Sequence, residues 1–107
     1  MATEDYAEAA KQYQAVLEQE PRNSKALRGL GYCQILGQDY AAAAATYRRA
    51  TEADPDDADA WAGLGNALLG RESWDEAERA FEKARALDPD NETVRKGMEV
   101  LQEHRKG

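Results

Sequence analysis

Apolar residues recur three and four positions apart along most of this chain, with polar or charged residues between them. The two clearest series run through residues 40–53 and 74–87, and they consist of Tyr40, Ala43, Tyr47 and Ala50, and of Trp74, Ala77, Phe81 and Ala84. Residues with this spacing share one face of an α-helix, so the pattern predicts amphipathic helices. No segment alternates between apolar and polar residues with period two, and strands are therefore not expected.

The pattern and its breaks predict six helices in the chain. Their expected ranges are 5–19, 24–36, 40–53, 58–70, 74–87 and 92–106. Asn23, Asp57 and Asn91 each precede one of these ranges and belong to the residue types that cap a helix N-terminus well.

Other end signals lie at the turns inside each pair of helices. Ser73, followed three residues later by Glu76, has the spacing of a capping box. Gly37 and Gly70 are expected at the inner turns, where a helix end commonly needs a residue in the left-handed conformation.

Three prolines, Pro21, Pro55 and Pro89, stand 34 residues apart. A fixed period of this length indicates stacked helical hairpins. The expected organisation is one domain, residues 1–107, made of a half unit (1–23), two full units (24–57 and 58–91) and a solvating C-terminal helix (92–107). The chain begins where the first helix of the half unit would end. We therefore expect either a fragment of a longer array or a unit whose N-terminal face associates.

Small residues are placed where the two helices of each unit would approach each other. Gly31 and Gly65 lie on the first helices and are expected to face Ala43 and Ala77 on the second helices. Small side chains on both sides would let the helix backbones come close, while Tyr47 and Phe81 fill the volume beside them.

The two full units contain most of the residues of one motif, W-x2-L-G-x2-Y followed by A-x3-F, A and P. The matching residues are Trp61, Leu64, Gly65, Ala77, Phe81, Ala84 and Pro89 in one unit, and Leu30, Gly31, Ala43, Tyr47, Ala50 and Pro55 in the other. The departures from the motif are Leu68, Leu27 and Gln34. The chain resembles the tetratricopeptide repeat family. This resemblance implies an all-α, right-handed superhelical solenoid that serves as a non-catalytic adaptor for other proteins.

The charge balance narrows the class of partner. Asp and Glu number 21 against 14 Lys and Arg, which gives a net charge of −7. Nucleic acid is bound through a clustered excess of basic residues, so a nucleic-acid partner is not expected. No apolar run approaches the ~20 residues that span a bilayer, so membrane insertion is not expected either. Cys33 is the only cysteine, which excludes an intrachain disulfide and favours a reducing, cytoplasmic setting.

The residues that could support catalysis are few. His104 is the only histidine and lies near the C-terminus, where we expect a solvated side chain rather than a general base. Cys33 is expected to be a buried small apolar residue. One Cys and one His cannot supply the four ligands of a structural zinc site. We therefore expect no enzyme activity, no metal and no cofactor.

The resemblance implies that the first helices of successive units line a concave groove. Carried over by position, the lining is Lys25, Arg28, Gly29, Tyr32, Ile35 and Leu36, then Asp59, Ala62, Gly63, Asn66 and Leu69, then Thr93, Lys96 and Val100. Lys25, Arg28 and Lys96 are candidates to pair with a ligand carboxylate, Asn66 to bond a ligand backbone, and Tyr32 to act as an aromatic anchor. The expected partner is a protein or peptide segment that carries an acidic residue beside an apolar one.

One subfamily of these repeats binds the C-terminal carboxylate of heat-shock chaperones with two Lys, two Asn and one Arg. Tyr32 and Gly63 stand at the two Asn positions here, and Gly97 stands at the Arg position. Chaperone tails are therefore disfavoured as ligands. Glycine at positions 29, 63 and 97 is expected to make the floor of the groove shallow and wide.

A structural role is the alternative to an adaptor. Residues 5–19 correspond only to the second helix of a unit, yet they contain Tyr6, Ala10, Tyr13 and Leu17. This helix would either fray or bury its apolar face, in a longer repeat array or by self-association with a second copy.

Overall fold

The computed structural model describes residues 2–107, with side chains from Asp5 onward. Its elements are α1 (Ala2–Gln19), α2 (Ser24–Leu36), α3 (Tyr40–Ala53), α4 (Ala58–Gly70), α5 (Trp74–Leu87) and α6 (Glu92–Lys106). The described residues contain no strand, and the predicted all-α class is confirmed. The predicted helix ranges are also confirmed, except that the first helix begins at Ala2 rather than at residue 5.

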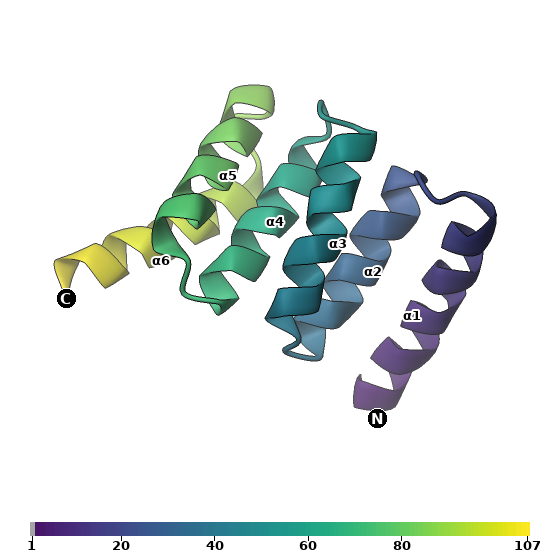
Figure 1. Cartoon of the computed structure of the whole chain (residues 1–107). Coiled ribbons are helices and arrows are strands. Elements are labelled where there is room, and N and C mark those ends of the chain that lie inside the picture. Colours follow the sequence, from purple (N-terminus) through teal and green to yellow (C-terminus); the bar gives the residue numbers. More distant parts are fainter. Residues whose placement is uncertain (1) are drawn as a thin grey trace.

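The helices form two layers, which Figure 1 shows one in front of the other. Each helix contacts the next along the chain, so α2–α3 and α4–α5 are antiparallel hairpins. The first helices of the units, α2, α4 and α6, also contact one another in that order, whereas the backbones of α1, α3 and α5 are not in contact with one another. The first helices thus lie closer together, which places them on the inner, concave side of a stack with extents of 42 × 31 × 20 Å.

The turn inside each hairpin has its left-handed residue at a position we did not predict. Gly37 has a φ of −84°, and Gly70 is the last residue of α4. The residues with positive φ are Gln38 (65°) and Glu72 (61°), which are one repeat apart. In the first turn the amide of Gln38 donates to the carbonyl of Ile35, and the amide of Asp39 donates to the carbonyl of Gln34. The second turn repeats both bonds one repeat later. Each turn is therefore a Schellman motif with the left-handed residue just past the cap.

The predicted caps that follow the prolines are confirmed. The side chains of Asn23, Asp57 and Asn91 accept hydrogen bonds from backbone amides in the first turns of α2, α4 and α6. The capping box at Ser73 is wrong, because its hydroxyl makes no capping bond. Glu76, the other half of that box, lies 3.4 Å from Arg48 of α3 instead, so its carboxylate is directed away from the helix start.

The aromatic rings that we expected beside the glycines, and not the alanines, are their nearest neighbours. A Cβ atom at Gly31 would lie 2.6 Å from Cε2 of Tyr47, and a Cβ at Gly65 would lie 2.7 Å from Cε1 of Phe81. The same ring of Tyr47 also meets Gly63 of the next unit. One aromatic side chain therefore fills the space between two successive first helices. Its burial also raises the pKa of the Tyr47 hydroxyl.

This packing contradicts the predicted role of three glycines as a shallow groove floor. A Cβ at Gly29 would meet the ring of Tyr13, and a Cβ at Gly97 would meet the ring of Phe81. Gly63 is buried beneath Tyr47. These glycines allow a close approach between units, and they do not open space for a ligand.

Candidate binding surface on the first helices

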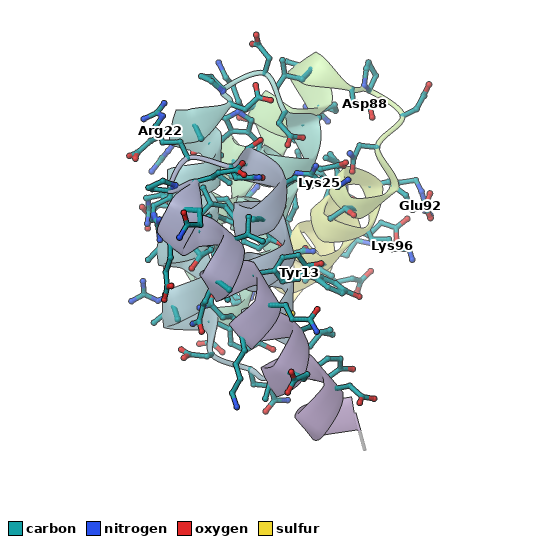
Figure 2. The ribbon with its side chains drawn as sticks, turned by 90° about the vertical axis from the view of Figure 1, so that its right-hand side faces the viewer. Tyr13, Arg22, Lys25, Asp88, Glu92 and Lys96 are labelled. Carbon is teal, nitrogen blue, oxygen red and sulfur yellow. The ribbon has the colours of Figure 1, made fainter. Side chains whose placement is uncertain are left out.

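The five predicted site residues lie on the layer of first helices. Lys25, Arg28 and Tyr32 are on α2, Asn66 is on α4 and Lys96 is on α6. Figure 2 shows Lys25 and Lys96 on the same side of the molecule, the side on which α6 projects. Lys25, Lys96 and Tyr32 are exposed, with Tyr32 at 59% the most exposed large apolar residue among residues 5–107, whereas Arg28 and Asn66 are half-buried.

Arg28 is engaged within the chain. Its Nε lies 2.7 Å from Oδ2 of Asp57, and its Nη1 lies 4.0 Å from Oδ2 of Asp59. The Asp57 side chain is only 15% exposed, so this pair is partly shielded from solvent. Lys25 and Lys96 form no ion pair with any residue in 5–107. The positive charge available to a ligand on this layer is therefore that of the two lysines.

A polar network that we did not predict joins all three first helices. Nδ2 of Asn91 donates to Oδ1 of Asp59 at 2.9 Å, while Oδ1 of Asn91 caps α6 by accepting from the amide of Val94. With the pairs that Arg28 makes, this contact links α2 to α4 and α4 to α6. The network holds the N-terminal ends of the three helices in fixed relative positions.

The lining predicted from the resemblance is only partly accessible. Ala62 and Gly63 are buried, so neither can contact a ligand. Tyr32 and Val100, on the two outer helices of the layer, are the exposed large apolar residues of this surface. A partner segment lying across the layer would meet these two side chains and the two lysines.

The structure gives a physical reason for the departure from the chaperone-binding subfamily. A Cβ at Gly63 would overlap the Tyr47 ring, and a Cβ at Gly97 would lie within 2.6 Å of three carbons of the Phe81 ring. An Asn at the first position or an Arg at the second would displace a buried aromatic ring. The carboxylate-binding residues of that subfamily therefore cannot be accommodated by this packing.

Neither Cys33 nor His104 is one of the exposed lysine and apolar residues of the candidate surface. Cys33 is buried, as predicted, and burial raises the pKa of its thiol. His104 is not simply solvated, because its ring stacks on Trp74 with centroids 3.7 Å apart. Next to it, Arg105 bonds Glu78 at 2.7 Å and lowers the pKa of that carboxyl. These contacts attach the end of α6 to α5.

Two features of other kinds of protein are absent from the described part of the chain. Within residues 2–107, no helix combines the length and the apolar content needed to cross a bilayer. Over the same part of the chain, no group of three or more His, Cys, Asp or Glu side chains has an arrangement that could hold a metal ion.

Solved structures similar to this chain share its fold. The TPR domain of Sgt2 from Aspergillus fumigatus is 24% identical, with a TM-score of 0.91 over 99% of this chain and 72% of that one. The first TPR of Spaghetti (RPAP3), bound to the HSP90 peptide SRMEEVD, is 17% identical, with a TM-score of 0.90 over 96% and 82%. SycD, a type III secretion translocator chaperone from Yersinia enterocolitica, is 21% identical, with a TM-score of 0.85 over 96% and 83%.

Family models give the assignment. No curated protein matches the chain significantly. Two models described as tetratricopeptide repeat match, one over residues 1–58 and the other over residues 36–101. Together with the helical hairpins and their 34-residue period, these matches mean that the chain belongs to the tetratricopeptide repeat family.

Proposed function

We propose that this chain is a non-catalytic adaptor that binds a segment of a partner protein across α2, α4 and α6. The observation that carries the proposal is the exposed ring of Tyr32 on the same layer as Lys25 and Lys96, two lysines without ion pairs in residues 5–107. An exposed aromatic residue beside cationic side chains is a frequent centre of protein recognition.

The partner segment is proposed to carry an acidic residue beside an apolar anchor. The lysines favour carboxylates, Tyr32 and Val100 favour an apolar side chain, and Asn66 can bond a backbone amide or carbonyl. Two similar structures hold acidic peptides that end in valine and aspartate, namely SRMEEVD and SGPTIEEVD. Because Gly63 and Gly97 leave no room for the carboxylate-binding side chains, we propose an internal acidic segment rather than a chain terminus.

The test selects ligands from a random peptide display library with the whole chain. Selected peptides are expected to combine Asp or Glu with a large apolar residue. Lys25→Glu with Tyr32→Ala should weaken their binding at least about tenfold, since an aromatic anchor alone contributes on the order of 2 kcal/mol. Arg28 is left unchanged because it pairs with Asp57.

The matched control places the same kinds of change elsewhere. Lys11→Glu with Leu87→Ala alters one exposed lysine and one exposed apolar residue on α1 and α5. This control should retain binding and the helical circular dichroism spectrum. Unchanged binding by Lys25→Glu with Tyr32→Ala would move the site off the first helices.

A self-associating module is the second candidate, and it is favoured by the outer face of α1. Val16 is 39% exposed, whereas Ala50 and Ala84, one and two repeats further along, are fully buried. In those units α2 and α4 cover the equivalent face. Under this candidate a second copy covers residues 5–19, so the sedimentation mass should rise with concentration and Val16→Glu should abolish the rise. A mass independent of concentration rules it out.

The setting of the protein is also proposed. A single cysteine, buried and away from any partner thiol, fits a reducing compartment such as the cytoplasm. Fractionation of the native source would test this assignment.

A further inference from the structure

A groove lies on the face opposite the first helices, between α3 and α5. The backbones of these two helices are not in contact, although the Arg48–Glu76 pair joins them, and α4 lies beneath both of them. The groove has a volume of about 370 Å³. Its floor is apolar and is formed by Trp61, Leu64 and Leu68, of which both leucines are buried while the tryptophan ring is half-exposed. A single large apolar side chain from outside would find contact on this floor.

The rim of the groove is cationic, although the chain as a whole is acidic. Arg48 of α3 and Arg79 and Lys83 of α5 border it, with Glu76 as the only carboxylate of the lining. Glu76 pairs with Arg48, and the Lys83 ammonium lies 5.8 Å from the centroid of the Trp61 ring. Arg79 forms no ion pair with residues 5–107. The rim therefore has uncompensated positive charge directly above an apolar floor.

The repeat supplies an internal comparison, since an equivalent groove lies between α1 and α3. Gln14, Gln34 and Thr46 line it at the positions of Arg48, Leu68 and Ala80. Its cation, Arg49, donates to the carbonyl of Pro21. The position of Arg79 is occupied by Ala45.

Folding accordingly does not require an apolar floor with a cationic rim, because the same scaffold is built with polar residues one unit earlier. Trp61 does have a structural role, as its indole nitrogen donates to the carbonyl of Pro55 at 2.8 Å. That bond uses the ring edge. Arg79 has no ion-pair partner in residues 5–107, and the face of the ring is approached by the Lys83 ammonium.

We propose that this groove is a second docking site, for an acidic peptide segment with one large apolar side chain. The apolar side chain lies on Trp61 and Leu68, and the flanking carboxylates pair with Arg79 and Lys83. The site does not depend on the surface of α2, α4 and α6, and together the two surfaces would let one chain bridge two partners.

The test is a nuclear magnetic resonance titration of the whole chain with the peptide Glu-Glu-Phe-Glu-Glu, acetylated and amidated so that it has no terminal charges. The indole Nε1–H resonance of Trp61 is expected to shift, together with amides of α3 and α5. Lys-Lys-Phe-Lys-Lys and Glu-Glu-Ala-Glu-Glu test the need for acidic charge and for the apolar side chain. Both should bind at least about tenfold more weakly.

The matched variant transplants residues from the equivalent groove. Leu68→Gln with Arg79→Ala installs the side chains present at Gln34 and Ala45, which this scaffold already tolerates, and it should weaken binding at least about tenfold. Lys25→Glu with Tyr32→Ala should leave the Trp61 shift and its dependence on peptide concentration unchanged while it removes shifts on α2, which separates this site from the proposed adaptor surface.

Three outcomes would overturn the proposal. They are the absence of any shift at Trp61 at millimolar peptide, shifts confined to α2 and α6, and unchanged affinity of the transplanted variant. Equal shifts with tripolyphosphate would reveal a site for small anions only and would also reject a peptide as the occupant.

Discussion

Gly63→Ala tests whether aromatic rings separate the units of the stack. A Cβ at this position would lie within 2.6 Å of three carbons of the Tyr47 ring, well inside the 3.5–4.0 Å of an ordinary carbon contact. The ring cannot retreat within its own plane, because Gly31 of the preceding first helix lies against its opposite edge. The substitution therefore forces apart α2 and α4 or displaces a buried side chain.

The sign of the effect is informative because alanine is normally the better helix residue. Replacing a glycine inside a helix with alanine should gain about 1 kcal/mol of stability. Inserting a methyl group into a closely packed core costs about 1–3 kcal/mol, and more where the neighbours cannot move. With a buried ring held from two sides, we expect the second effect to prevail, with a net loss of about 1–2 kcal/mol.

Thermal and urea unfolding followed by circular dichroism would measure this loss. A loss of this size should lower the melting temperature by several degrees in a domain of this length. Gly37→Ala is the control, since its nearest neighbour would be a carbonyl oxygen at 3.6 Å and its φ is −84°. That variant should be as stable as the unchanged chain or slightly more stable.

A double-mutant cycle identifies the ring as the cause. In a Tyr47→Leu background the ring is gone, so Gly63→Ala should become neutral or stabilising. The reasoning is refuted if Gly63→Ala alone is as stable as the unchanged chain, or if its cost is the same in both backgrounds.

Four further variants address the ends of the helices. Glu72→Gly removes a left-handed non-glycine residue and should stabilise the chain by about 0.5–1 kcal/mol in urea unfolding, with no gain if the turn is unstrained. Asn91→Ala removes a cap and a bond to α4 and should cost about 1–2 kcal/mol, whereas Ser73→Ala, without a capping bond, should cost little; equal costs would contradict the cap geometry. Arg105 lowers the folded-state pKa of Glu78, so their contact stabilises the chain above the unfolded pKa of the carboxyl and is lost as pH falls through the folded pKa. Arg105→Ala should raise the pKa of Glu78 toward its ordinary value in a carboxyl titration by nuclear magnetic resonance, and an unchanged pKa would mean that the contact does not persist in solution.

The helices were predictable because their signals are local. Caps such as Asn23 and Asn91, and the three- and four-residue spacing of apolar positions, act within a few residues of the element that they define. The left-handed turn position was missed, because we expected glycine there and the turns place Gln38 and Glu72 instead. The amino-acid sequence alone does not reveal which residue of a turn adopts the strained left-handed conformation.

The contacts between helices were harder to predict. We expected Gly31 to face Ala43, with Tyr47 beside them, whereas the side chain nearest to Gly31 is the ring of Tyr47, one turn after Ala43 on α3. Which side chain fills such a gap depends on the crossing of two helices, which a periodicity does not contain.

Predictions about the site were limited by the same difficulty. Asp57 was recognised as a cap, but its ion pair with Arg28 joins residues far apart in sequence and arises only when α2 and α4 are stacked. The groove between α3 and α5 was not predicted, because it lies between two helices whose backbones are not in contact. The internal repeat does hold a signal for it, since Arg79 and Leu68 stand where the preceding unit has Ala45 and Gln34.

The ring between units also has a mechanical consequence. Tyr47 is held by Gly31 and Gly63, and Phe81 by Gly65 and Gly97, whereas Tyr13 meets only Gly29 in the described part of the chain. Under tension applied at the two ends, α1 should therefore detach at the lowest force. The remaining helices should extend elastically, with the distance between successive first helices set by the aromatic ring between them. A partner bound to α1 would therefore be attached to a compliant part of the molecule, whereas a partner bound between α4 and α6 would be attached to a stiff part.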